Sequence, residues 1–323
     1  MRKPIVVVGS VNLDLVSKGK KIPAPGETVR GESFQTFNGG KGANQAVAAA
    51  RLGYPVSMIA KVGGDDFGAR LRGALEAEKI DVAHVGTAAS LSSGVAMISV
   101  DEKGQNSITV VPGANDALMP ADLDACRETL RAAGMILAQL EIPLETVERL
   151  SQLAAEFGVP MMLDPAPARP IPQQILKRVT YLTPNETETL TLCGITKSEL
   201  DLTTAAECAK QLQAQGVANV VIKMGSRGAY VTDASGAATF VPTIKVAVVD
   251  STAAGDAFNG AFASALLSGK DLLQAVRYAA AAGAVSVTRA GAQPAMPAAA
   301  EVEALLAQNG QALKEPEMVK IGG

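Results

Sequence analysis

Residues 246–258 read VAVVDSTAAGDAF: an apolar run, a group of small residues and the start of an amphipathic segment. The run 246–249 predicts a buried strand, and the apolar residues within 257–266 share one face of a helix. The whole stretch therefore predicts a strand, a tight turn and a helix N-terminus. The free N–H groups of a first helical turn and the positive end of the helix dipole form a site for an anion, which small side chains allow to approach the backbone.

Asp256 adds a carboxylate to this predicted anion site, and its presence there has two interpretations. It is either a cap on the helix N-terminus, or a base that accepts a proton from a hydroxyl attacking a phosphoryl group. The residue taken alone favours neither interpretation.

The stretch DSTAAGDAF resembles the C-terminal signature of the ribokinase (PfkB) family of sugar and nucleoside kinases, whose usual form is DTxGAGD. Ser251 and Ala253 depart from that form. The resemblance implies an α/β fold with a mostly parallel central sheet, helices on both of its faces and a small β-sheet lid. It also implies that Asp256 is the catalytic base and that the anion hole for the transferred phosphoryl group is formed by Ala253, Ala254 and Gly255.

Composition argues against several other classes of protein. The chain has 323 residues, of which 48% are hydrophobic, so it can bury a large core. A net charge of -3 without a basic stripe argues against nucleic acid as a partner. The 3 cysteines lack CxxC spacing, and no signal peptide or membrane-length apolar run is apparent, so a cytoplasmic protein is expected. The single histidine, His84, has no suitable partners beside it, so general-base chemistry would fall to carboxylates.

Strand-like runs alternate with amphipathic helices along most of the chain, as in a parallel sheet covered on both faces. Among them we expect a strand at 179–182 and helices at 44–52, 144–157 and 186–192. Residues 15–37 and 94–111 break this rhythm and alternate like strands with one solvated face, which predicts a small separate sheet. The resemblance implies that these segments form a lid over the sugar and that the lids of two subunits pack into a homodimer. We expect one ribokinase-like domain over residues 1–307 and a C-terminal tail over residues 308–323.

Several polar residues are expected at the ligand-binding edge of the sheet. The motif GSVNLD at 9–14 follows the first strand, and NGGKGANQA at 38–46 precedes a helix without the spacing of a Walker A loop. An Asx turn, a flexible glycine turn and a solvated strand-end carboxylate would account for these features without a ligand. Their resemblance to the sugar-binding motifs of the family implies that the sugar is held by Asn12, Asp14, Gly40, Lys41, Asn44, Glu141 and Asp256.

Two later segments resemble nucleotide-binding motifs. The sequence NETE at 185–188 reads as a capping box, which is a sufficient structural explanation by itself. It also resembles the NxxE motif of the family, which implies that Asn185 and Glu188 organise Mg²⁺ beside the nucleotide, largely through water. The segment 223–228 predicts a glycine turn into a hairpin, and the resemblance implies contacts to ATP from Asn185, Lys223, Gly225, Ser226, Arg227, Gly228, Ala254 and Gly255.

The resemblance further implies a potassium site built mostly from backbone carbonyls. Its ligands would come from Asp250, Thr252, Ser286, Arg289, Gly291 and Ala295. Ala280 stands where some family members carry a polar or aromatic residue near the adenine, so the contacts to the base stay open.

These motifs cover about residues 4–305 and imply an ATP-dependent kinase for the primary hydroxyl of a small sugar. Polar residues around the substrate favour D-ribose, phosphorylated at O5 to D-ribose 5-phosphate, since a nucleoside would need an apolar or aromatic slot for its base. Two alternatives stay open: a kinase of another pentose, a ketose or a nucleoside such as adenosine, and a sugar- or nucleotide-binding regulator without catalysis. The intact Asp256, anion hole and NxxE motif favour the enzyme.

Overall fold

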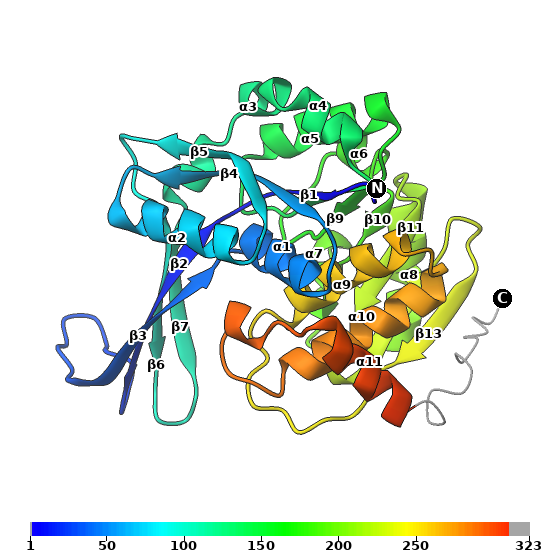
Figure 1. Cartoon of the computed structure of the whole chain (residues 1–323). Coiled ribbons are helices and arrows are strands. Elements are labelled where there is room, and N and C mark those ends of the chain that lie inside the picture. Colours follow the sequence, from blue (N-terminus) through cyan, green and yellow to red (C-terminus); the bar gives the residue numbers. More distant parts are fainter. Residues whose placement is uncertain (1, 310–323) are drawn as a thin grey trace.

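The centre of the molecule, a computed structural model that describes residues 2–309, is a nine-stranded sheet (Figure 1). The strand order is β13-β12-β11-β10-β9-β8-β1-β4-β5. Within the described residues, β12 and β13 at one edge of this sheet run antiparallel to their neighbours. All other neighbouring pairs in the sheet are parallel. The strands are β1 (Ile5–Val8), β4 (Val56–Gly63), β5 (Asp81–Ala88), β8 (Met135–Ala138), β9 (Met161–Leu163), β10 (Tyr181–Leu182), β11 (Asn219–Lys223), β12 (Gly228–Thr232) and β13 (Ala238–Pro242).

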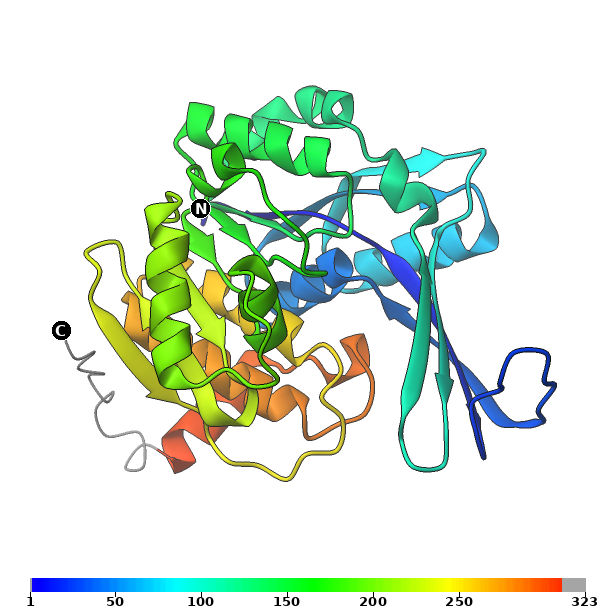
Figure 2. The same ribbon diagram turned by 180° about the vertical axis from the view of Figure 1, so that it is seen from behind.

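Helices cover both faces of this sheet, which confirms the predicted α/β class. Ile5 and Val7 of β1 belong to one hydrophobic core and Val6 and Val8 to another, because successive side chains of a strand point to opposite faces. The first core is closed by α1 (Lys41–Arg51), α2 (Asp66–Ala77), α9 (Ala254–Leu267), α10 (Leu272–Ser286) and α11 (Ala299–Gln308) (Figure 1). The second is closed by α3 (Pro120–Ala125), α4 (Arg127–Ala132), α5 (Leu144–Phe157), α6 (Gln173–Leu176), α7 (Glu186–Leu192) and α8 (Leu202–Ala214) (Figure 2).

A second, four-stranded sheet projects from the main body (Figures 1 and 2). Its strand order is β3-β2-β6-β7, and β2 follows directly from the end of β1. The predicted separate small sheet is thus confirmed, with strands that extend closer to the main sheet than the alternating pattern indicated. Its strands are β2 (Asn12–Gly19), β3 (Gly31–Gly39), β6 (Gly94–Val100) and β7 (Asn106–Val111).

The strand predicted at 246–249 is wrong. Residues 243–249 adopt neither strand nor helix, and the side chains of Val248 and Val249 are largely exposed. After β13 the chain crosses to α9 without a strand beside it, and the N–H groups of Val249 and Asp250 both donate to the carbonyl of Val287 at the end of α10. An apolar run indicates that its side chains pack against other parts of the protein. It does not show whether a neighbouring strand is available for hydrogen-bonded pairing.

The glycine-rich motif forms the start of a helix rather than a loop before one. The helix predicted from residue 44 begins at Lys41, and Gly40 precedes it with φ of 90°. A Cβ on Gly40 would lie 2.7 Å from the Asn12 backbone nitrogen, so both conformation and space require glycine here. The strand predicted at 179–182 is shorter than expected, because only Tyr181 and Leu182 pair with neighbouring strands.

The described residues also form three short 3₁₀ turns: η1 (Gly113–Ala117), η2 (Gly225–Arg227) and η3 (Gln293–Ala295). None of the helices within residues 2–309 combines the length and the apolar character needed to cross a lipid bilayer. Of the tail expected at 308–323, residues 310–323 lie outside the described residues, and Gln308 is the last residue of α11.

Candidate active site

Asp256 is buried near the N-terminus of α9 but does not cap it. The capping position is Ala253, and Asp256 lies inside the first helical turn with its carboxylate directed at α1. Its Oδ2 accepts a hydrogen bond from Nδ2 of Asn44 at 3.0 Å, and its Oδ1 accepts one from Nε2 of Gln45 at 3.1 Å. The capping interpretation is therefore wrong, which leaves a buried carboxylate held by two amides.

The electrostatic environment of Asp256 suits a group that exchanges a proton near neutral pH. Burial raises the pKa of its carboxyl from 3.8 to about 6; Lys41 and the two amide donors oppose this rise and Asp164 adds to it. A carboxyl with this pKa is mostly ionised at pH 7 and can still take up a proton.

Lys41 stays protonated beside this carboxylate although it is enclosed. Burial alone would lower the pKa of its ammonium, but four surrounding carboxylates together raise that pKa above its ordinary value. A fixed cation therefore lies among the acidic groups Asp256, Asp164, Glu141 and Glu188.

The turn before Asp256 presents free backbone donors. Ala253 has φ of 57°, a left-handed conformation that is uncommon outside glycine. The Ala254 N–H donates to the Ser251 carbonyl at 3.3 Å, whereas the N–H groups of Gly255 and Asp256 donate to no acceptor within residues 2–309. Of the three donors predicted for the anion hole, the one on Ala254 is thus partly engaged, and Asp256 supplies a free donor as well as the carboxylate.

A lysine ammonium lies beside these donors. A Cβ on Gly255 would be 3.3 Å from Nζ of Lys223, which comes from the end of β11. The same ammonium donates to Asp164 at 2.9 Å in a buried ion pair. A free N–H group and a held cation therefore lie next to each other, as an anion site requires.

The residues predicted to hold the sugar come together at the carboxyl end of β1. Glu141 accepts hydrogen bonds from the Ser10 hydroxyl at 2.5 Å and the Lys41 N–H at 3.2 Å, so it is not a free strand-end carboxylate. Burial and, to a smaller extent, the nearby charges of Glu141 and Asp256 together raise the pKa of Asp14 from 3.8 to about 7. Asp14, Lys41, Glu141 and Asp256 thus share one enclosed space.

Asn12 and Asn44 present polar groups toward this space from β2 and α1. Oδ1 of Asn12 accepts from Nδ2 of Asn115 at 2.7 Å, and a Cβ on Gly94 would lie 2.1 Å from that oxygen. Oδ1 of Asn44 is buried and has no partner among the described residues, so it can accept from a bound hydroxyl.

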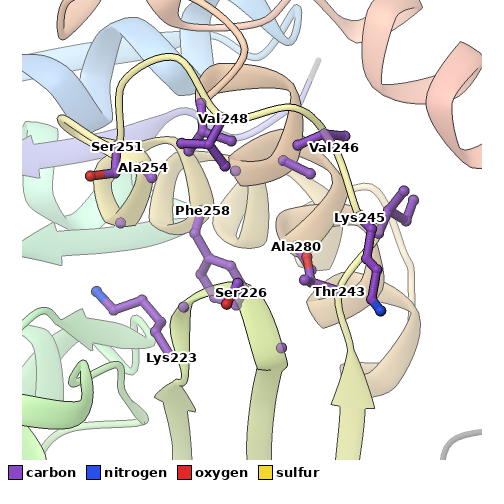
Figure 3. A pocket seen from close by; sticks show the side chains of 17 residues that line it. Lys223, Ser226, Thr243, Lys245, Val246, Val248, Ser251, Ala254, Phe258 and Ala280 are labelled. Atoms are coloured by element: carbon purple, nitrogen blue, oxygen red, sulfur yellow. The ribbon is translucent and has the colours of Figure 1, made fainter.

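A cavity of about 590 Å³ lies next to the free N–H groups (Figure 3). Lys223 and Ala254 lie at one end of it and Thr243 and Ala280 at the other, with Phe258 between them. Its other lining residues are Gly225, Ser226, Gly228, Ile244, Lys245, Val246, Val248, Ser251, Gly255, Gly283, Ala284 and Val287. A cationic end and a mostly apolar remainder match a phosphate chain attached to a planar base. Val246 and Val248, from the apolar run that was mistaken for a strand, line this cavity.

Two residues predicted to contact ATP lie outside this lining. Arg227 pairs with Glu186 and donates to the Leu200 carbonyl, so its guanidinium is engaged elsewhere. Asn185 caps α7 and does not line the cavity either.

Asn185 and Glu188 form the predicted capping box. Oδ1 of Asn185 accepts from the Glu188 N–H at 2.8 Å, and Oε2 of Glu188 accepts from the Asn185 N–H at 2.7 Å. The other carboxylate oxygen, Oε1, accepts from Nδ2 of Asn185 at 2.8 Å. Burial raises the pKa of Glu188, Lys223 opposes the rise and Asp164 adds to it. Residues 2–309 hold no group of three or more His, Cys, Asp or Glu side chains that could bind a metal directly.

The two segments of the predicted potassium site lie side by side. The Asp250 carboxylate accepts from the Thr252 N–H at 2.9 Å and from the Gly291 N–H at 2.8 Å, which joins the loop before α9 to the loop after α10. Within the described chain, the carbonyls of Asp250, Thr252 and Gly291 accept no hydrogen bond. Of the other three residues, Ser286 accepts at its carbonyl from the Arg289 N–H and Ala295 from the Arg289 guanidinium, whereas the Arg289 carbonyl accepts no hydrogen bond among the described residues.

Comparison with known proteins identifies the family. The family described as "pfkB family carbohydrate kinase" matches residues 2–299. The chain belongs to this family. It is 43% identical over 304 residues to the ribokinase of Bacillus subtilis (strain 168), covering 94% of this chain and 99% of that one. It is 41% identical over 306 residues to the ribokinase of Schizosaccharomyces pombe, covering 93% and 96%. The structure of Arabidopsis thaliana ribokinase complexed with ribose and ATP superposes with a TM-score of 0.88 at 35% identity, covering 95% and 99%.

The motifs of this carbohydrate kinase did not reveal every polar residue in its site. Asp164, just after β9, contacts both Lys223 and Gln45, and Asn115 orients Asn12. Asp164 had a usable signal, because it follows a predicted strand at the edge where open α/β sheets bind ligands. Asn115 had none, since it lies in the short turn η1, far from Asn12 in sequence.

Proposed function

We propose that this pfkB-family kinase transfers the γ-phosphoryl group of ATP to the O5 hydroxyl of D-ribose, giving D-ribose 5-phosphate and ADP. The observation that carries the proposal is the position of Asp256, a buried carboxylate between a polar enclosure and an anion site with free N–H groups. Relatives named ribokinase at 43% and 41% identity support ribose as the sugar.

The polar enclosure would bind the sugar. Ribose presents hydroxyls on every carbon that is not part of its carbonyl, so it needs many donors and acceptors in a small volume. Asp14 and Glu141 are acceptors when ionised, Lys41 is a donor, and the unpartnered Oδ1 of Asn44 is an acceptor that a sugar hydroxyl would satisfy. The complete proposed set is Asn12, Asp14, Gly40, Lys41, Asn44, Glu141 and Asp256.

The reaction then needs one proton acceptor and stabilisation of one anion. As O5 attacks the γ-phosphorus, its proton passes to the Asp256 carboxylate; the bond from the phosphorus to the β-γ bridging oxygen breaks and ADP leaves. The N–H groups of Ala253, Gly255 and Asp256 and the Lys223 ammonium stabilise the charge on the transferred group, with Ala254 contributing when its bond to Ser251 opens. Asp256 later loses the proton to solvent.

The cavity would bind ATP with its phosphates toward Lys223 and its adenine toward Ala280. Small and aliphatic side chains at Ala280, Gly283 and Ala284 leave room for a planar ring, so the adenine would be held by apolar contact. Further contacts are proposed for Gly225, Ser226, Gly228, Ala254 and Gly255. Asn185 and Arg227 would act only through water or after movement, because their side chains are bonded elsewhere.

The proposed ions fit the residues present. Glu188 accepts one hydrogen bond on each oxygen and keeps acceptor capacity, so together with Asn185 it suits Mg²⁺ held through water. Mg²⁺ would neutralise phosphate charge. The open carbonyls of Asp250, Thr252 and Gly291 suit K⁺, with Ser286, Arg289 and Ala295 completing the proposed set. That ion would order the turn before α9.

We also propose a homodimer formed through the small sheet and a cytoplasmic location. The face of the small sheet opposite Asp14 exposes the large apolar side chains of Phe34, Met97 and Val111, which a second copy would cover. Cys126, Cys193 and Cys208 are free thiols, as expected in a reducing compartment. Light scattering of the pure protein and cell fractionation test these two proposals; a monomeric mass would refute the first.

A coupled assay of ADP release with D-ribose, 2-deoxy-D-ribose, D-fructose and adenosine tests the proposed function. Ribose should have the highest kcat/KM, because each missing hydroxyl leaves a buried polar group unpaired at a cost of about 1–3 kcal/mol. A higher kcat/KM for adenosine would reject ribose as the substrate. Absence of ADP release with all four compounds would favour a binding protein instead.

A further inference from the structure

Gln45 joins two carboxylates that would otherwise repel each other. Its Nε2 donates to Oδ1 of Asp256 at 3.1 Å and to Oδ2 of Asp164 at 3.0 Å. An amide nitrogen carries two hydrogens, so both are used. All three side chains are buried, and water cannot easily replace either bond.

Gln139 fixes the orientation of the Gln45 amide. Nε2 of Gln139 donates to Oε1 of Gln45 at 2.8 Å from the segment after β8. With its oxygen held by a donor, the amide of Gln45 can only turn its nitrogen toward the carboxylates. The reverse orientation would place an oxygen against two anionic groups and leave the Gln139 donor without an acceptor.

Asp164, the second carboxylate bound by Gln45, is connected to the anion site. Asp164 accepts from the Gln45 amide with one oxygen and from the Lys223 ammonium with the other. Lys223 lies beside Gly255 and lines the cavity. One continuous set of hydrogen bonds therefore runs from Gln139 through Gln45 and Asp164 to Lys223, with the carboxylate of Asp256 attached to it.

We propose that Gln45 is a positioning residue for phosphoryl transfer, which holds the Asp256 carboxylate in a fixed place relative to the Asp164–Lys223 pair. The proposal rests on the proposed role of Asp256 as base. Gln45 is not among the residues proposed to contact the sugar and does not line the cavity, so it acts through Asp256. A base and an anion-stabilising cation that share one rigid support keep their separation during the reaction, which is where positioning has its largest effect.

The charge of Asp256 responds to every group that faces it. Lys41 and the amides of Asn44 and Gln45 approach from α1, Asp164 from the loop after β9, and Asp14 from β2. The Gln45 hydrogen bond lowers the pKa of Asp256. Loss of that bond should therefore move the acid limb of the kcat profile to higher pH, in addition to loosening the base.

Gln45→Met tests the proposal, because methionine keeps the length and removes both donors. We expect kcat to fall about 10- to 100-fold, with the KM for the sugar changed less than about threefold and the acid limb raised by about half to one pH unit. Gln139→Met should give a smaller change in the same direction, since it frees the Gln45 amide without removing its donors. Thermal unfolding shows whether each variant is folded.

A folded Gln45→Met enzyme with kcat and acid limb within experimental error of the unchanged protein would overturn the proposal. If Gln45→Met does not fold, an unchanged kcat profile of Gln139→Met has the same consequence. These results differ from failure of the proposed function, in which the unchanged protein fails to phosphorylate a sugar or Asp256→Asn remains fully active.

Discussion

Replacing Asp256 with asparagine should remove most of the turnover and, at neutral pH, stabilise the fold. The change keeps the size of the side chain and removes its charge and its ability to accept a proton. Loss of a general base typically lowers turnover by about 10²–10⁴-fold. Binding of sugar and ATP should change little, because most of the proposed contacts come from other residues.

The stability gain follows from the pKa of the carboxyl. This pKa is about 6 in the folded protein, whereas the ordinary value for an aspartate side chain, which applies to the unfolded chain, is 3.8. Folding therefore disfavours the ionised form. The penalty is absent below pH 3.8, grows as the pH rises toward 6 and is complete above it. At about 1.4 kcal/mol per pH unit, ionised Asp256 destabilises the fold by about 3 kcal/mol at neutral pH. Asparagine removes this penalty but loses one bond to Asn44 or Gln45, so a net gain of about 1–2 kcal/mol is expected.

Urea unfolding at neutral pH and at pH near 4, with the ADP-release assay, measures both effects. The gain should be present at neutral pH and nearly absent near pH 4, where Asp256 is protonated. Glu76 is an exposed carboxylate on α2, so Glu76→Gln is a matched control. It should change the free energy of unfolding by less than about 0.5 kcal/mol. Turnover within a few-fold of the unchanged protein would remove Asp256 from the mechanism, and marked destabilisation at neutral pH would show that its charge is stabilised rather than penalised.

Two further predictions concern pH and potassium. Below a pH of about 6, kcat/KM should fall about tenfold per pH unit, because protonated Asp256 cannot accept a proton from the sugar; a flat profile down to pH 4.5 would contradict this assignment. Turnover should be higher in potassium chloride than in matched sodium or tetramethylammonium chloride, because an ion on the carbonyls of Asp250 and Thr252 would order the turn before α9, whereas screening does not distinguish the salts. Equal kcat in all three salts would reject the ion site and leave the kinase assignment intact.

Local patterns in the sequence predicted the features that depend on neighbouring residues. The helices Leu144–Phe157 and Glu186–Leu192 have the predicted bounds, because amphipathic spacing, a closing Gly158 and the Asn185–Glu188 capping box act within a few residues. The alternating segments of the small sheet were predicted for the same reason. The run 246–249 was misassigned because pairing of a strand depends on a distant neighbour, and here Val246 and Val248 line a cavity instead.

The residues of the candidate site also fall into those that a local pattern indicates and those that only the tertiary structure brings together. The family resemblance of local motifs singled out Asp256, Asn44 and Lys223, because each of them lies in or beside a glycine-containing stretch. The sequence could not show that Gln45 bridges Asp256 to Asp164, since those residues are separated by 211 and 119 positions along the chain. That bridge exists because the parallel sheet brings the ends of β8, β9 and β11 to the same edge as the start of α1, where hydrogen bonds and charge, rather than sequence neighbours, decide which side chains meet.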